Sequence, residues 1–156
     1  MFHLTNAWAI PEEPILIGVP FKLNQFLMRE AQECFLIDDD LDDQELFLMA
    51  LERVDKNINC FVASNGIDAL KRLSQVNGFV PDYIFLDINM PKMNGMACLV
   101  EIKKLDHLDQ TEILMFSTSS DIKIIETSKA LGANNFLVKP PSMDLLVEKL
   151  AKILRR

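Results

Sequence analysis

Four short apolar segments of the sequence each end in side chains that can bind a metal ion or a phosphoryl group. In chain order these endings are Asp38-Asp39-Asp40, Asp87, Ser117-Thr118 and Lys139-Pro140. Clustered carboxylates repel one another, and a divalent cation relieves that repulsion. Oxygen ligands suit Mg2+, which often bridges protein carboxylates and a phosphate. The lysine and the serine can then hold phosphoryl oxygens, and Asp87 can act as a carboxylate nucleophile in phosphoryl transfer.

These endings belong to a chain that alternates between strand-like and helix-like segments. Continuous apolar runs predict strands at 34–37, 59–63, 83–86, 113–116 and 135–138. Apolar residues at helical spacing predict helices at 42–54, 66–76, 95–105, 121–131 and 142–154. Strands that are apolar throughout are expected in a parallel sheet covered by helices on both faces. We therefore expect an α/β protein, a three-layer (βα)5 doubly wound sandwich, with its chemistry at the carboxyl ends of the strands.

Several polar residues are expected to define helix ends rather than to do chemistry. Asp121 and Ser142 are predicted N-caps, and Gly132 is a predicted C-terminal stop. Asp42 and Asp43, together with the preceding Asp40, are assigned to capping and to the first-turn helix dipole.

Length, charge and cysteine content limit the class of protein. A chain of 156 residues favours one domain, and a net charge of -7 disfavours direct binding to nucleic acid or to anionic membranes. The three cysteines form no paired motif and are expected to be buried free thiols. No apolar run is long enough to span a membrane, and no signal peptide is recognisable, so we expect a cytoplasmic protein.

The chain divides into two parts of different character. Residues 1–32 are rich in proline for their length and lack a long period, and they are predicted to be an N-terminal extension of uncertain status. Residues 33–156 are predicted to be the domain itself. Only two residues follow the last predicted helix, so we expect no separate output domain.

Four segments together resemble the receiver domains of response regulators, the CheY-like proteins of two-component systems. They are Phe35-Leu36-Ile37-Asp38-Asp39-Asp40, Leu86-Asp87-Ile88-Asn89-Met90-Pro91-Lys92-Met93-Asn94-Gly95, Leu114-Met115-Phe116-Ser117-Thr118 and Phe136-Leu137-Val138-Lys139-Pro140. The resemblance runs from about residue 33 to residue 154, in the family's order. It implies a flavodoxin-like or CheY-like sheet with strand order 2-1-3-4-5.

The resemblance also implies a role for each matching residue. Asp87 would be the phosphoacceptor, and Mg2+ would be held by Asp38, Asp39, Asp87 and the backbone carbonyl of Asn89. Lys139 would pair with the phosphoryl group. Ser117 and Phe136 would form the switch that responds to it, and the bond between Lys139 and Pro140 would be cis. The chain departs from the family in having Phe136 where Tyr is frequent, and a second proline, Pro141, after Pro140.

The resulting hypothesis is a phosphoacceptor response regulator rather than an enzyme. A sensor histidine kinase or a histidine phosphotransfer protein would donate the phosphoryl group, and the signal would pass to an unidentified target by protein contact. The sequence leaves monomer and homodimer open. Ile122, Ile124 and Ile125 cannot all face the core, so they indicate either a partner surface or packing on a neighbouring helix.

Three alternatives compete with this hypothesis. A degenerate receiver that only binds proteins would usually lack the acceptor, the lysine or the acidic pair, all of which are present. A phosphatase of the haloacid dehalogenase type needs a second acid two residues after the nucleophile, where this chain has Asn89. A flavodoxin-like nucleotide binder would need a glycine-rich loop after the first strand, and none is present.

Overall fold

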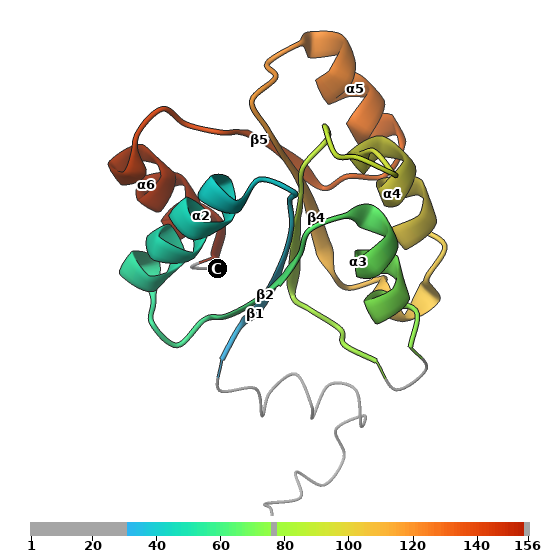
Figure 1. Ribbon diagram of the computed structural model, residues 1–156, viewed down its shortest axis with the longest axis horizontal. Coiled ribbons are helices and arrows are strands. Elements are labelled where there is room, and N and C mark those ends of the chain that lie inside the picture. The colour runs from blue at the N-terminus through green and yellow to red at the C-terminus, as the bar shows by residue number, and fades with distance from the viewer. Residues whose placement is uncertain (1–30, 76–77, 155–156) are drawn as a thin grey trace, which may run out of the picture. The chain divides into compact units, whose positions relative to one another are not determined.

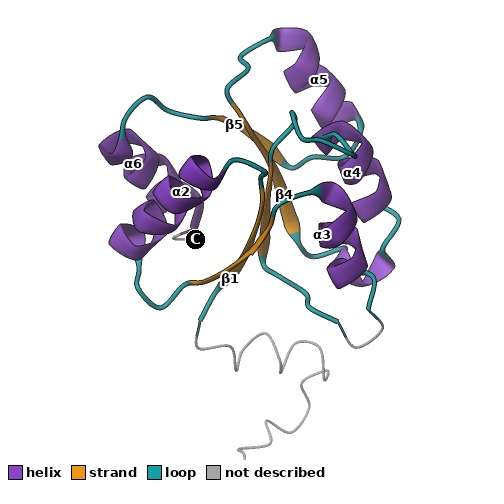
Figure 2. Cartoon of the chain, viewed as in Figure 1, coloured by secondary structure: helices purple, strands orange, loops and turns teal. Residues whose placement is uncertain are grey.

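A computed structural model describes residues 31–75 and 78–154 of the chain. The first 30 residues of the predicted N-terminal extension lie outside the described part. The elements in chain order are β1 (Glu33–Ile37), α2 (Leu41–Val54), β2 (Asn59–Ala63), α3 (Gly66–Leu73), β3 (Tyr83–Leu86), α4 (Gly95–Ile102), the 3-10 helix η1 (Asp106–Leu108), β4 (Glu112–Ser117), α5 (Ile122–Ala130), β5 (Asn135–Val138) and α6 (Met143–Leu154). Figure 2 shows the regular alternation of strand and helix that the sequence predicts.

The five strands form one parallel sheet in the order β2-β1-β3-β4-β5. Both the (βα)5 architecture and the strand order are therefore confirmed. The central strands are β1, β3 and β4. Their carboxyl ends carry Asp38, Asp87 and Ser117, the last being the final residue of β4 itself.

Helices cover both faces of the sheet, which explains why the strands are apolar throughout. Helices α2 and α6 lie on one side of the sheet and α3, α4 and α5 on the other (Figure 1). Alternate side chains along a strand point to opposite faces. Thus Phe35 and Ile37 belong to the core under α3 and α4, while Cys34 and Leu36 belong to the core under α2 and α6.

Side chains cap the helices at the predicted positions, including Ser142, whose hydroxyl accepts from the N–H of Leu145 at 3.3 Å. Asp40 caps α2 by accepting hydrogen bonds from the backbone N–H groups of Asp42 and Asp43, at 2.9 and 3.1 Å. Asp121 caps α5 in the same way, accepting from the N–H of Lys123. Gly132 follows α5 with φ +105°, a left-handed conformation that glycine adopts without strain, so its predicted role as a stop is confirmed.

Helices α3 and α4 are shorter than their apolar periodicity predicts. Helix α3 ends at Leu73, and the next residue, Ser74, donates its N–H to the carbonyl of Leu70 as a C-cap. Helix α4 ends at Ile102, the next residue, Lys103, donates its N–H to the carbonyls of Leu99 and Glu101 as a C-cap, and η1 follows with Leu108 buried. His107 of η1 is exposed, and its Nε2 atom contacts the backbone carbonyl of Leu73 at 2.8 Å.

All three cysteines are free, as expected, with Cys34 and Cys98 buried and Cys60 half-buried. Burial raises the pKa of the thiols of Cys60 and Cys98 to about 12. Such thiols are poor nucleophiles and are not candidates for chemistry. Within the described residues, no helix combines the length and the apolar character needed to cross a membrane.

Candidate functional site

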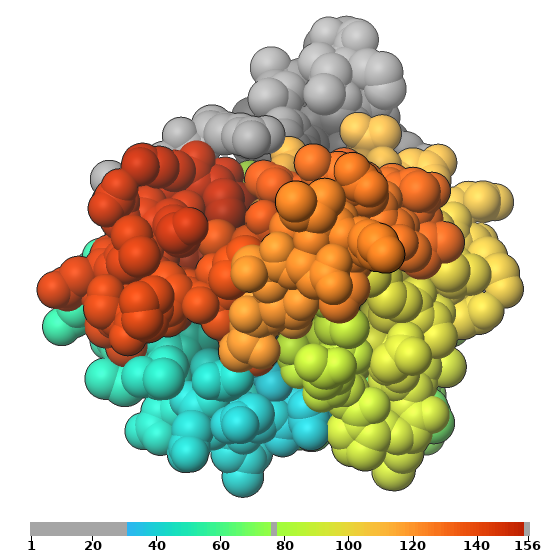
Figure 3. All heavy atoms as spheres, turned by 90° about the horizontal axis from the view of Figure 1, so that it is seen from above, coloured from blue at the N-terminus to red at the C-terminus, as the bar shows by residue number. Residues whose placement is uncertain are grey.

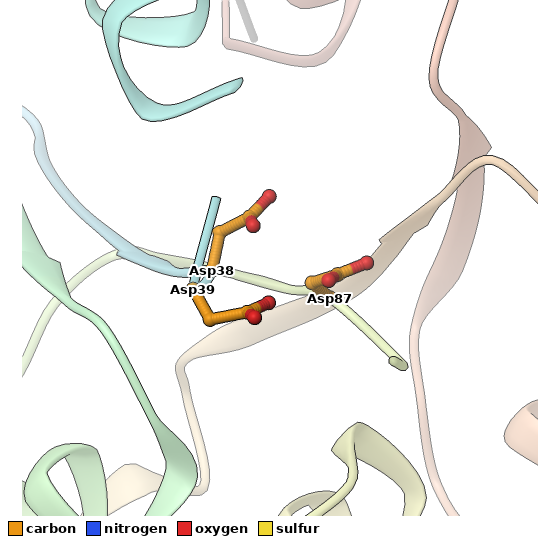
Figure 4. A group of neighbouring side chains, drawn as sticks. All are labelled: Asp38, Asp39 and Asp87. Atoms are coloured by element: carbon orange, nitrogen blue, oxygen red, sulfur yellow. The ribbon is translucent and has the colours of Figure 1, made fainter. Parts of the chain in front are cut away.

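Three carboxylates gather at the carboxyl edge of the sheet. Asp38, Asp39 and Asp87 each place a carboxylate oxygen within 4.8 Å of those of the other two. Figure 4 shows the side chains of Asp38 and Asp39 at the end of β1 and that of Asp87 beside them. Asp38 and Asp87 are buried, at 0% and 7% exposure, whereas Asp39 is exposed. Two of the three carboxylates are thus buried in the protein interior, and the third faces solvent.

Strand register brings these carboxylates together. Ile37 of β1 and Leu86 of β3 are register partners in the parallel pair. The next residues therefore leave the sheet side by side, and the backbone N–H of Asp87 donates to the carbonyl of Ile37 at 2.9 Å. Asp38 is fixed on its other side, where its N–H donates to the carbonyl of Ala63 at 3.1 Å. Because both backbones extend the sheet ladder, the separation of the two carboxyl groups is set by the fold.

A glycine allows the loop after β3 to fold back over Asp87. The N–H of Gly95 donates to the carbonyl of Ile88 at 2.8 Å. A Cβ atom at position 95 would overlap the backbone carbonyl oxygen of Asp87 and lie 2.8 Å from the Cα atom of Ile88. Position 95 therefore requires glycine for close backbone approach, and the start of α4 is held directly against the backbone of Asp87.

Lys139 extends from the end of β5 into the acidic cluster. Its Nζ atom lies 2.7 Å from Oδ2 of Asp38, 2.7 Å from Oδ2 of Asp43 and 3.5 Å from Oδ1 of Asp87. The ring of Phe116 lies under the ammonium, with its centroid 5.2 Å from Nζ. The lysine side chain is 11% exposed, so these partners replace most of its water.

The predicted cis bond between Lys139 and Pro140 is wrong for this structure. No cis peptide bond is present among the described residues, so this bond is trans. The two forms of a bond before proline differ by only about 0.5–1 kcal/mol, so sequence alone does not fix the isomer. The long stem of Lys139 brings Nζ to Asp38 from the trans geometry, while its backbone N–H donates to the carbonyl of Ser117 at 2.8 Å.

Burial and charge shift the protonation of the site. Burial raises the pKa of Asp87 to about 6; the nearby ammonium of Lys139 opposes that shift and the charge of Asp38 adds to it. Burial likewise raises the pKa of Asp38, although the hydrogen bond from Lys139 opposes it. For Lys139, burial by itself lowers the pKa, but hydrogen bonds to Asp38 and Asp43 more than offset it and the pKa is raised. The lysine therefore stays charged among carboxylates that resist ionisation.

The donor set fits a hard divalent cation. Carboxylate oxygens are the ligands that Mg2+ prefers, and the exposed side of the cluster leaves room for the waters that Mg2+ retains. A dication beside Asp38, Asp39 and Asp87 would offset the repulsion and the burial that raise the pKa values of the two buried acids. Asn89 is an exposed residue of the loop after β3, two positions beyond Asp87. The role of its backbone carbonyl as a ligand stays a prediction.

Ser117 and Phe136 lie on neighbouring strands, where the sequence places them. Ser117 ends β4 with 0% exposure, and its hydroxyl oxygen accepts a hydrogen bond from the N–H of Ser119 at 3.3 Å. Phe136 of β5 is half-buried against the core under α3 and α4, beside its register partner Met115. Their action as a switch stays a prediction.

Figure 3 looks down on the molecule from above, the side at which the strands end in Figure 1. The cyan start of α2, the yellow-green loop after β3 and the orange segment around α5 adjoin on this face. On this face, segments that follow β1, β3 and β4 therefore lie next to one another.

Sequence reasoning missed two residues that shape the site. Asp43, assigned to capping and to the helix dipole, forms one of the two short ion pairs of Lys139. Gln44 donates from Nε2 to the backbone carbonyl of Asp38 at 2.6 Å and to the hydroxyl of Ser64 at 3.3 Å. Both stand in the first turn of α2, directly after the acidic run. Their closeness to the acidic run in the sequence was the signal that could have found them. It does not show which side chains of the helix face the site.

Comparison with known proteins identifies the domain type that this geometry matches. A family model described as the response regulator receiver domain matches residues 34–151, more than half of the chain. The chemotaxis protein CheY of Bacillus subtilis is 34% identical over 92 residues, which cover 59% of this chain and 72% of CheY. A protein-glutamate methylesterase/protein-glutamine glutaminase of Methanospirillum hungatei is 37% identical over 79 residues, 51% of this chain. The chain spans only 22% of that longer relative.

Solved structures give the same result. The Mn2+-bound form of the response regulator Rcp1 matches with a TM-score of 0.69 and 25% identity, covering 78% of this chain and 91% of Rcp1. The phosphorylated cyanobacterial phytochrome response regulator RcpA matches with a TM-score of 0.71 and 28% identity, covering 79% of this chain and 91% of RcpA.

Proposed function

The chain belongs to the family of response regulator receiver domains, and on this premise we propose that it accepts a phosphoryl group on Asp87 in a Mg2+-dependent reaction. The observation that carries the proposal is the cluster itself. Three carboxylates lie within 4.8 Å of one another, and the ammonium of Lys139 lies 3.5 Å from Asp87. A metal-bound neighbour and a phosphorylated neighbour with the same fold support it.

The proposed reaction transfers a phosphoryl group from a histidine nitrogen of a partner protein. A carboxylate oxygen of Asp87 forms a bond to phosphorus as the phosphorus–nitrogen bond breaks, and the released imidazole regains a proton. The product is an acyl phosphate. A bound Mg2+ supplies positive charge that neutralises the phosphoryl oxygens. Lys139 supplies a further positive charge, and the register of β1 with β3 holds Asp87 at a fixed distance from the metal ligands.

The phosphorylated state would then signal by changing the surface near β4 and β5. The hydroxyl of Ser117 is free to turn from the N–H of Ser119 toward a phosphoryl oxygen, since that bond is long at 3.3 Å. Phe136, on the neighbouring strand, can then pack further inward. Helix α5 presents Ile122 at 69% exposure, while Ile124 and Ile125 are half-buried, so part of this surface is available to a partner.

A sensor histidine kinase or a histidine phosphotransfer protein is the proposed donor, and a protein target is the proposed receiver of the signal. In this proposal the chain catalyses only its own phosphorylation and dephosphorylation. A phosphatase of the haloacid dehalogenase type is disfavoured because Asn89 cannot serve as the acid that protonates a leaving group.

The test is uptake of a phosphoryl group from acetyl phosphate, measured by intact mass with Mg2+ and with the metal chelated. A gain of about 80 Da that needs Mg2+ supports the proposal. No gain in either condition would contradict it and would favour a receiver that binds partners without phosphorylation. Steady release of phosphate from p-nitrophenyl phosphate would instead indicate a phosphatase.

A further inference from the structure

Lys139 is held more closely by the two acids near α2 than by the proposed acceptor. An ammonium group has three N–H donors. Two of them make 2.7 Å bonds, to Asp38 and to Asp43, while the contact to Asp87 is 3.5 Å. The third donor is left for a phosphoryl group on Asp87, which must share the charge of the ammonium with these two acids.

The two acids differ in what a metal would do to them. Asp38 belongs to the carboxylate cluster that fits a divalent cation, so a bound cation competes with Lys139 for its oxygens. Asp43 is outside that cluster and lies in the first turn of α2 with its side chain 33% exposed. The ion pair of Asp43 with Lys139 is therefore not broken by a cation bound at Asp38, Asp39 and Asp87.

Resting on the proposed function, we propose that Asp43 is a positioning residue that competes with the phosphoryl group for Lys139. In the metal-bound resting state, Asp43 keeps the ammonium on the α2 side of the site. Phosphorylation of Asp87 draws the ammonium away from it. Asp43 thus disfavours both the uptake and the retention of a phosphoryl group on Asp87, and so raises the threshold for activation of the domain.

The competition is strong enough to be measured. The pair between Lys139 and Asp43 is 2.7 Å long, and because its side chains are only 11% and 33% exposed, it is screened by salt less than a surface salt bridge is. Asparagine at position 43 keeps the size of the side chain and removes its charge. We expect Asp43→Asn to bind beryllofluoride, a mimic of the phosphoryl group, about 3- to 10-fold more tightly in the presence of Mg2+.

A neighbouring acid provides a matched control. Asp42 lies in the same turn of α2, and the ion pairs of Lys139 within the described residues are with Asp38, Asp43 and Asp87, not with Asp42. Asp42→Asn therefore removes the same charge from the same turn without freeing the lysine. Asp43→Glu restores a carboxylate and should return the wild-type affinity for beryllofluoride.

A spectroscopic readout separates positioning from a general change of surface charge. Hydrogen bonding slows the exchange of ammonium protons, so we expect Nζ–H signals of Lys139 in 15N-resolved NMR spectra of the wild type with Mg2+. These signals should broaden or disappear in Asp43→Asn and persist in Asp42→Asn. Phosphoryl uptake from acetyl phosphate should be faster in Asp43→Asn than in Asp42→Asn.

The outcomes distinguish this inference from the proposed function. If the wild type takes up a phosphoryl group but Asp43→Asn matches Asp42→Asn in beryllofluoride affinity and uptake rate, the competition by Asp43 is refuted and the proposed function stands. Weaker binding in Asp43→Asn would also refute it, because Asp43 would then assist the lysine. If the wild type takes up no phosphoryl group and binds no beryllofluoride, the proposed function itself fails.

Discussion

The Nζ atom of Lys139 lies 2.7 Å from Oδ2 of Asp38. This ion pair joins the end of β5 to the end of β1, its partners stand 101 positions apart in the sequence, and Asp38 is completely buried. A buried carboxylate that loses its cationic partner is left with an uncompensated charge. The lysine therefore has a structural role in the resting domain beside its proposed role toward the phosphoryl group.

Replacing the lysine should accordingly destabilise the metal-free domain. We expect Lys139→Met to lower the free energy of unfolding by about 2 to 4 kcal/mol without Mg2+, measured by urea denaturation. Added Mg2+ should recover part of the loss, because a cation at Asp38 compensates the same charge. Lys152→Met is the control, since it breaks the exposed pair with Glu148 and should change stability by no more than about 0.5 kcal/mol. Equal effects of the two variants would contradict this role.

The stability of the metal-free domain should depend on the ionisation of Asp87. Its folded pKa is raised from 3.8 to about 6, so the folded state binds this proton more tightly than the unfolded chain does. The contribution to stability is complete below pH 3.8 and is lost as the pH rises through about 6.

Removing the charge of Asp87 should therefore stabilise the metal-free domain at high pH. We expect Asp87→Asn to be more stable than the wild type by about 1 to 3 kcal/mol at pH 8 with EDTA, and the difference to shrink toward pH 5. The measurement is urea denaturation across this pH range. A difference that does not change with pH would mean that Asp87 titrates near its ordinary pKa.

Metal binding should depend on the exposed member of the cluster. We expect Asp39→Asn to weaken Mg2+ binding by at least about 10-fold in calorimetric titration, because a ligand carboxylate is lost. Asp42→Asn removes an equal charge outside the cluster and should weaken binding far less. Equal losses would show that Mg2+ responds to net charge rather than to this site.

Close backbone approach at Gly95 should make the site intolerant of a single methyl group. Gly95→Ala should destabilise the domain by about 2 to 4 kcal/mol and lower phosphoryl uptake, because the backbone at Asp87 must move. Gly66→Ala is the comparison, since its Cβ would meet side-chain atoms rather than backbone, namely the sulfur of Met93 at 3.2 Å and the Cβ and Sγ atoms of Cys98 at 3.3 Å. We expect it to lower stability by no more than about 1.5 kcal/mol. If position 95 tolerates alanine as well as position 66 does, the close approach is not required.

The strands could be predicted because they depend on patterns that a single chain displays, whereas their order was implied by the resemblance to a family. Uninterrupted apolar runs such as Tyr83–Leu86 indicate a parallel sheet, and the parallel sheet brings the strand endings to one edge. Asp38, Asp39 and Asp87 were identified by that reasoning and by the resemblance to a family, and the structure brings them together with Lys139.

The remaining features depend on distances that sequence patterns do not encode. The ion pair of Asp43 with Lys139 depends on how the first turn of α2 faces the end of β5. The trans bond before Pro140 is one of two forms of nearly equal energy. Helix α4 stops at Ile102, three residues before its predicted end, and the buried apolar residue that follows, Leu108, belongs to η1.

The central claim, that Asp87 is the residue that carries the phosphoryl group, is tested most directly by locating the modification. The domain would be treated with acetyl phosphate and Mg2+, trapped by borohydride reduction of the acyl phosphate, and mapped by peptide mass spectrometry. The account predicts reduction at Asp87 alone, and no phosphoryl gain of about 80 Da in the intact mass of Asp87→Asn. Modification at Asp38 or Asp39, or undiminished uptake by Asp87→Asn, would contradict it.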